Sequence, residues 1–260
     1  MILDEIVANK KEEVAAQKLK VSRFDLEEQV GQTRAPRDFR RALRRPGISL
    51  IAEIKRQSPA KGLLMPDMDH IALASVYEQT GARAISVLTD QKYFKGSLDD
   101  LKGAHQTVSI PCLRKEFIID EYQIYEARVA HADAILLIVR ILSDQQIKDY
   151  LALARQLGMS VLVETHNEEE IERALNTGAH IIGINNRDLD TLEVDINTSI
   201  RLKKYVPGGN VLVSESGIHT RHHVELLDEG GVDAILVGEA LVTSKNIAAK
   251  IRELLGEDES

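Results

Sequence analysis

Residues 49–59, Ser-Leu-Ile-Ala-Glu-Ile-Lys-Arg-Gln-Ser-Pro, begin as a largely apolar strand that carries ionisable side chains, first Glu53 and Lys55, where it ends. Because side chains alternate along a β-strand, Glu53 and Lys55 share one face with Ile51, and the residues between them are apolar. A strand covered on both faces is normally an unbroken apolar run. A carboxylate and an ammonium at its end therefore indicate acid–base chemistry, with a structural ion pair as the alternative for this pair alone.

The pattern that must position these residues begins near residue 48, where strand-like runs alternate with amphipathic helices. The ends of the eight runs lie 21 to 34 residues apart, which leaves room for one helix after each strand. Eight such units predict an α/β protein with a (β/α)8 TIM barrel and an N-terminal helical extension. No Gly-x-Gly-x-x-Gly follows the first run, which argues against a dinucleotide-binding sheet. The runs are 49–55, 84–89, 110–117, 134–139, 160–164, 181–185, 211–215 and 234–237.

The helices between the runs carry boundary signals of their own. Ser143 and Gln146 have the spacing of a capping box, and the helix that they begin ends at Gly158. Asn167 and Gly178 mark the start and end of the next helix in the same way. These signals support the count of β/α units independently of the strands.

Reactive side chains should gather at the carboxyl ends of the strands, because the active sites of this fold lie there. The alternate residues expected to face the helices, such as Ala52, Ile54, Val163 and Ile184, are apolar. We therefore predict one active-site mouth built from strand ends that are far apart in the sequence. Its reactive residues are Glu53, Lys55, Lys115, Glu164, Asn185, Arg187, Glu215 and Ser216.

A phosphate site is predicted after the seventh and eighth runs, where such barrels commonly bind phosphate through backbone N–H groups. Ser216-Gly217 follows the seventh run and Gly238-Glu239 follows the eighth. Glycine lets the backbone approach an anion closely, and the serine hydroxyl adds a donor. Because a carboxylate does not suit a phosphate, we expect the side chain of Glu239 to point away and its N–H to bind.

Aromatic residues make up only 4% of the chain, so their positions are informative. Phe94 follows the second run, and Phe117 ends the third. Together with Leu137 of the fourth run, they are expected to wall a flat apolar subsite for an aromatic ring. For each aromatic alone, core packing is the alternative interpretation.

Residues 1–47 form the predicted helical extension. Apolar residues at helical spacing near its start predict an amphipathic helix, and a second short helix is expected over residues 23–31. The segment 33–47 is locally basic, which is typical of a solvated helix face. The alternative, which we adopt for the domain assignment, is that the extension covers one mouth of a single barrel domain formed by residues 1–260.

Composition limits the classes of partner. The net charge of −8 argues against a nucleic-acid-binding face. A single cysteine, Cys112, excludes an internal disulfide and a cysteine zinc cluster, and the spacing of the eight histidines suits no ligand set, so no metal is expected. No run of about 18 apolar residues predicts a membrane span, and the N-terminus has no signal-peptide core. We expect a cytoplasmic monomer with neither nucleic-acid nor membrane partners.

Six segments at strand ends carry a family resemblance. The most specific are Glu-x-Lys-x-x-Ser-Pro at 53–59 and Asn-Asn-Arg-Asp-Leu at 185–189. With these segments the chain resembles the indole-3-glycerol-phosphate synthase family of tryptophan biosynthesis, over essentially its whole length. Glu239 is a departure, because some members of the family have serine at that position. The six segments are 51–59, 92–97, 113–117, 162–166, 184–189 and 214–218.

The resemblance implies a carboxy-lyase that needs no cofactor. Its sugar-phosphate substrate, 1-(2-carboxyphenylamino)-1-deoxyribulose 5-phosphate, becomes indole-3-glycerol phosphate with loss of carbon dioxide and water. Lys115 would be the acid of ring closure, with a pKa lowered by apolar groups and a second ammonium, and Glu164 the base. Lys55, oriented by Glu53, would act as an acid or pair with the substrate carboxylate, and which lysine serves which step stays open. The remaining roles are Asn185 on a ribulose hydroxyl, Ser58 in the loop after the first strand, Arg187 at the rim, Ser216, Gly217 and Gly238 at the phosphate, and Phe94, Phe117, Leu137, Glu215 and Glu239 in substrate binding.

Two other functions are alternatives to this one. Phosphoribosylanthranilate isomerase, the neighbouring pathway step on the same fold, would use a cysteine and an aspartate, yet Cys112 lies early in its strand. A barrel that only binds a phosphorylated metabolite would need no acid–base set such as Lys55, Lys115 and Glu164. Association with other enzymes of the tryptophan pathway is left open.

Overall fold

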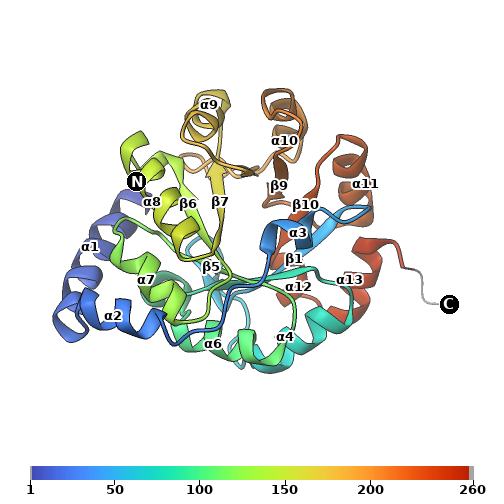
Figure 1. Cartoon of the computed structure of the whole chain (residues 1–260). Helices are drawn as coiled ribbons and strands as arrows, with labels where there is room; N and C mark the ends of the chain where they lie inside the picture. Colours follow the sequence, from blue (N-terminus) through green and yellow to red (C-terminus); the bar gives the residue numbers. More distant parts are fainter. Residues whose placement is uncertain (1, 258–260) are drawn as a thin grey trace.

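Eight parallel strands close into a barrel in the computed structural model, which describes residues 2–257 (Figure 1). The order around the barrel is β1-β10-β9-β8-β7-β6-β5-β4, so the predicted (β/α)8 barrel is confirmed. A two-stranded antiparallel hairpin, β2 (Gln57–Ser58) and β3 (Gly62–Leu63), follows β1. The barrel strands are β1 (Ser49–Ile54), β4 (Ala84–Leu88), β5 (Cys112–Lys115), β6 (Ala134–Ile138), β7 (Ser160–Thr165), β8 (Ile181–Asn185), β9 (Val211–Glu215) and β10 (Ala234–Val237).

Helices surround the barrel and begin at the predicted caps. Ser143 forms a capping box with Gln146 at the start of α8, and Asn167 caps α9 through the N–H of Glu170. The observed β5 is shorter than the predicted third strand, residues 110–117, at both ends, and it starts after Pro111, which has no N–H to donate to a ladder. The helices after β1 are α4 (His70–Gln79), α5 (Gln91–Phe94), α6 (Leu98–Thr107), α7 (Tyr122–Val129), η1 (Val139–Ile141), α8 (Asp144–Gln156), α9 (Glu168–Asn176), α10 (Asn197–Leu202), η2 (Lys203–Tyr205), α11 (Arg221–Glu229), α12 (Glu239–Val242) and α13 (Ile247–Leu255).

The strands alternate between two apolar layers. Leu50, Ala52 and Ile54 of β1 pack outward in the large cluster between barrel and helices. Ile51 belongs to a separate cluster inside the barrel. Because the period is two, Glu53 continues the inner row and reaches the cavity at the carboxyl end.

The N-terminal extension consists of α1 (Ile2–Lys20), α2 (Arg23–Val30) and α3 (Phe39–Leu43). Helices α1 and α2 lie outside the ring beside α7, whereas α3 lies across its centre (Figure 1). Phe39 and Leu43 are fully buried in the inner cluster with the first residues of the strands, so α3 closes the amino end of the barrel. Arg41 and Arg44 of the same basic segment are exposed. Met1 and residues 258–260 of the predicted domain lie outside the described part.

Candidate active site

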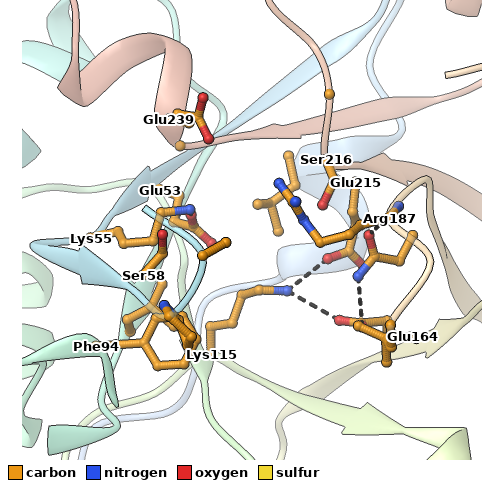
Figure 2. A pocket seen from close by; sticks show the side chains of 18 of the residues that line it. Glu53, Lys55, Ser58, Phe94, Lys115, Glu164, Arg187, Glu215, Ser216 and Glu239 are labelled. Atoms are coloured by element: carbon orange, nitrogen blue, oxygen red, sulfur yellow. Dashed lines mark hydrogen bonds and ion pairs between the residues drawn. The ribbon is translucent and has the colours of Figure 1, made fainter. Parts of the chain in front are cut away.

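A cavity of about 560 Å³ lies at the carboxyl end of the barrel. Figure 2 shows Lys115 at its centre between Glu164 and Glu215, with Glu53, Lys55, Ser58 and Phe94 on the opposite side. Of the fifteen residues predicted for the site, all but Leu137 line this cavity. They are Glu53, Lys55, Ser58, Phe94, Lys115, Phe117, Glu164, Asn185, Arg187, Glu215, Ser216, Gly217, Gly238 and Glu239.

Lys115, the last residue of β5, joins two carboxylates from distant strands. Its Nζ lies 2.7 Å from Glu215 Oε2 and 3.2 Å from Glu164 Oε2. Burial alone would lower the pKa of the ammonium, but Glu215, Glu164 and Glu53 together raise it above its usual range. The predicted lowered pKa of Lys115 is therefore wrong, because its neighbours are carboxylates and not a second ammonium. The three carboxylates thus favour the protonated form of Lys115.

Glu164, near the end of β7, is held in its ionised form. Its Oε1 accepts a hydrogen bond of 3.0 Å from Asn185 Nδ2 and lies 3.4 Å from His166 Nε2. Burial would raise the pKa of Glu164, but the Lys115 cation, followed by His166 and Asn185, holds it far below its usual range. The side chain is thus a buried carboxylate whose two oxygens have different partners.

Glu215, at the end of β9, has the opposite electrostatic character. Burial, together with the charges of Glu164 and Glu53, raises its pKa to about 7, even though Lys115 opposes the shift. Its Oε1 is buried without a hydrogen-bond partner among residues 2–257. A Cβ at Gly183 of β8 would overlap this oxygen, so the side chain has room only because that position is glycine. The two carboxylates around Lys115 are therefore unequal, because the pKa of Glu164 is lowered and that of Glu215 is raised.

Glu53 and Lys55 form a second ion pair on the other side of the cavity. Glu53 Oε2 lies 2.5 Å from Lys55 Nζ, and the carboxylate is almost completely buried. A Cβ at Gly238 would overlap Glu53 Oε2, so the glycine after β10 leaves space for this carboxylate. The pair positions one ammonium above β1, across the cavity from Glu164 (Figure 2).

The residues of the predicted phosphate end all line the cavity. Ser216 and Gly217 both have left-handed backbone, with φ of 69° and 80°, and they line the cavity together with Gly238. Glu239 also lines it, and its Oε1 accepts a 2.5 Å hydrogen bond from Lys61 in the loop after β1. The negative charge beside this end is thereby paired with a lysine that also lines the cavity.

The apolar wall differs from the predicted one in a single residue. Phe94 and Phe117 lie with ring centroids 6.0 Å apart. Leu137 is fully buried in the outer cluster, so its predicted place in the wall is wrong. Leu136 and Ile138 line the cavity instead, because alternate residues of β6 face inward. The charged residues of neighbouring strands already indicated which positions face the cavity, so the inward-facing residues of β6 could have been inferred from the sequence.

Several other cavity residues were not predicted. Leu3 and Ile6 of α1 line the cavity and are buried, so the first helix forms part of its wall. Their helical spacing was visible in the sequence, and the extension was expected to cover one mouth of the barrel, but the spacing alone did not show which side chains would line the cavity. Lys61 carried no signal beyond its charge. His166, which contacts Glu164 from outside the cavity lining, lies in one of the segments that matched the family.

Within residues 2–257, no group of three or more His, Cys, Asp or Glu side chains could hold a metal ion. Over the same residues, no helix combines the length and the apolar character that crossing a bilayer requires.

Fold and site together define a (β/α)8 barrel with a charged cavity at the carboxyl ends of its strands, the arrangement found in enzymes of this fold. The family model described as indole-3-glycerol phosphate synthase matches residues 3–254. The chain belongs to the indole-3-glycerol phosphate synthase family.

Relatives at high identity agree with this assignment, and solved structures agree with the fold. The indole-3-glycerol phosphate synthases of Endomicrobium trichonymphae and Roseiflexus sp. (strain RS-1) are each 49% identical to the chain, and the alignments cover 98% of it and 99% and 98% of those proteins. The chain also resembles 3-hexulose-6-phosphate synthase from Salmonella typhimurium (TM-score 0.66, 14% identity, covering 80% of this chain and 97% of that one). A chain of the tryptophan synthase α2β2 complex from Pyrococcus furiosus is similar too (TM-score 0.59, 17% identity, covering 80% and 97%). These two structures support the fold alone.

Proposed function

We propose that the chain is a carboxy-lyase that converts 1-(2-carboxyphenylamino)-1-deoxyribulose 5-phosphate to indole-3-glycerol phosphate, carbon dioxide and water. Family membership supports this reaction. The observation that carries it is the contact of Lys115 with both Glu164 and Glu215 in one cavity that also contains the Glu53–Lys55 pair. Ring closure, decarboxylation and dehydration need a proton donor and a proton acceptor within reach of one substrate.

The lining of the cavity favours one orientation of the substrate. Its phosphate binds the backbone N–H groups of Ser216, Gly217 and Gly238, all of which line the cavity, and Ser216 and Gly217 have the left-handed backbone found in anion-binding turns. Its aromatic ring packs against Phe94 and Phe117. In this orientation the sugar ketone lies over the centre of the barrel, near Lys115. The ring carboxylate then lies on the side of the cavity where the ammonium of Lys55 stands.

Ring closure uses Lys115 as the acid. As the ring carbon attacks the ketone, the carbonyl oxygen develops alkoxide charge, and Lys115 transfers a proton to it. The raised pKa of Lys115 does not prevent this transfer, because an alkoxide is more basic than an amine. The ring then loses its carboxylate as carbon dioxide and regains aromaticity.

Dehydration uses Glu164 as the base. It removes a proton from the carbon next to the new alcohol while the hydroxyl leaves with a proton from an acid, for which Lys55 is the candidate. Once Lys115 has given up its proton, the cation that most strongly depresses the pKa of Glu164 is gone, so the carboxylate becomes more basic. The acid step thereby prepares the base for the next one.

The test is incubation of the purified chain with the ribulose phosphate, with indole fluorescence and carbon dioxide release as readouts. Appearance of both supports the proposal. Binding without carbon dioxide release would instead indicate a barrel that only binds the metabolite. Turnover of the isomerase substrate alone would also overturn the proposal. The structure argues against that activity, because Cys112 is fully buried, and burial and Asp133 raise the pKa of its thiol.

A further inference from the structure

The ring of His166 lies between two carboxylates at the point where β7 passes into α9. Its Nε2 is 3.4 Å from Glu164 Oε1, and its Nδ1 is 3.0 Å from Glu170 Oε2. Only 8% of the side chain is exposed, and it does not belong to the cavity lining. The ring therefore reaches the active site only through Glu164.

Glu170 is itself fixed in place. Its Oε2 accepts a 2.8 Å hydrogen bond from the backbone N–H of His166, and its own N–H donates to Asn167 Oδ1 at the cap of α9. The carboxylate lies in the first turn of the helix, where the partial positive charge of the N–H groups favours an anion. The loop after β7 thus provides a rigid, negatively charged support for the ring.

An imidazole in this position is held as a cation. Burial would lower its pKa, but the two carboxylates, Glu164 and Glu170, raise the pKa of His166 to about 10. These two carboxylates, from β7 and α9, are the charged groups that face the ring. Arg140 of η1 lies near Glu170 and pairs with Asp190. Protonation makes both ring nitrogens donors. Nδ1 is hydrogen-bonded to Glu170 Oε2 at 3.0 Å, whereas Nε2, which has no hydrogen-bond partner among residues 2–257, faces Glu164 Oε1 at the ion-pair distance of 3.4 Å.

We propose that His166 is a positioning residue for the catalytic base, a protonated link that anchors Glu164 to Glu170. The inference rests on the proposed function, in which Glu164 accepts a proton. His166 and Asn185 share Oε1 of Glu164, which leaves Oε2 turned toward Lys115 and the reacting atoms. When Lys115 loses its proton, the imidazolium remains as a cation beside Glu164. It then keeps the carboxylate ionised and correctly oriented for dehydration.

The test compares His166→Gln and Glu170→Gln with the wild-type chain. Glu172→Gln is the matched control, because Glu172 belongs to the same helix and is exposed. The measurements are kcat and KM between pH 5 and pH 10, at a temperature well below each unfolding transition. We expect His166→Gln to lower kcat by about 10- to 100-fold, the effect of misplacing one general base, with KM within about threefold of wild type. The acidic limb of kcat should move to higher pH, because Glu164 loses a neighbouring cation.

Glu170→Gln gives a sharper signature because it keeps the ring. With one carboxylate removed, the pKa of His166 should fall toward its usual value, and kcat should show a new decrease as pH rises through that value. This new decrease should be absent in the variant that combines His166→Gln with Glu170→Gln, because it has no imidazole at this position. It should also be absent in Glu172→Gln. A ring-nitrogen NMR titration of the wild-type chain gives a readout independent of turnover, and we expect His166 to be protonated at pH 7.

Each other outcome contradicts the link. Unchanged kcat profiles in both variants, with only a lower unfolding temperature, would show that His166 merely stabilises the junction of β7 and α9. A neutral His166 ring at pH 7 in the NMR titration would also contradict the proposal, because the link requires a protonated ring. If His166→Gln does not fold, the pH profile of Glu170→Gln and the NMR titration still test whether His166 is a protonated link. Absence of product from the wild-type chain would overturn the proposed function instead, which the NMR titration does not depend on.

Discussion

The two mouths of the barrel are built from the same strands and have opposite chemistry. At the amino end, inner side chains such as Ile51, Leu113 and Val211 pack on Phe39 and Leu43 of α3 in an apolar plug. Two to four residues further along these strands, the inner row ends in charged groups around the cavity. Among the described residues, Glu53, Lys115, Glu164 and Glu215 belong to this second group.

This difference teaches that stability and chemistry are separated along the barrel axis. The plug contributes burial of apolar surface and contains none of the ionisable cavity residues. The cavity contains buried ion pairs, whose desolvation cost offsets much of their attraction, so their contribution is chemical more than stabilising. Substitutions at the two mouths should therefore have different readouts, and each prediction below tests that separation.

The largest effect is expected at Lys115. Lys115→Ala removes the proton donor of ring closure and should lower kcat by about 10²- to 10⁴-fold, while the chain stays folded. The measurement is steady-state turnover with an unfolding curve for each protein. Lys102→Ala, on the partly exposed side of α6, is the control and should be neutral. Near-normal turnover of Lys115→Ala would remove this residue from the mechanism.

The amino-end plug should respond in stability and not in rate. Phe39→Ala leaves a cavity beneath the strands and should lower the free energy of unfolding by about 3–5 kcal/mol. Below the unfolding transition, kcat should stay close to wild type. Phe24→Ala is the matched control, because Phe24 is 65% exposed and its truncation removes little buried area. A large loss of kcat in folded Phe39→Ala would show that the two mouths are coupled.

Neighbouring leucines of β6 test the alternation between the two layers. Leu137→Ala should lower the free energy of unfolding by about 2–5 kcal/mol with KM unchanged, because Leu137 packs outward. Leu136→Ala should also destabilise the chain and, in addition, raise KM, because Leu136 lines the cavity. The KM values of the two variants, measured at a temperature where both are folded, show which of the two leucines faces the cavity. Equal KM values would contradict the assigned faces.

The smallest effect is expected at the rim of the phosphate end. Glu239→Gln removes a negative charge near the phosphate and releases Lys61, so KM should fall. The expected decrease is only about twofold to fivefold, because a partly exposed ion pair such as Lys61–Glu239 contributes little energy. Added salt should reduce the difference, since such charges are screened. Glu229→Gln, exposed at the end of α11, serves as control. An increase in KM would mean that Glu239 assists phosphate binding.

Much of this architecture could be inferred from the order of residues. The barrel, the helix caps at Ser143 and Asn167, and the gathering of charged residues at strand ends all depend on local periodicity. A strand has a period of two whatever surrounds it, so Glu53 and Lys55 could be placed on one face from their spacing. The identity of the cavity followed, because parallel strands bring their carboxyl ends to the same mouth.

The electrostatic state of the site depended on contacts across the barrel. Lys115 contacts Glu164 and Glu215, which lie 49 and 100 residues away in the sequence, and these two carboxylates reverse the direction expected for its pKa. The position of His166 between Glu164 and Glu170 is likewise set by how α9 packs after β7. A pKa depends on which charges lie within a few ångströms, and those neighbours come from strands that only the closed barrel brings together.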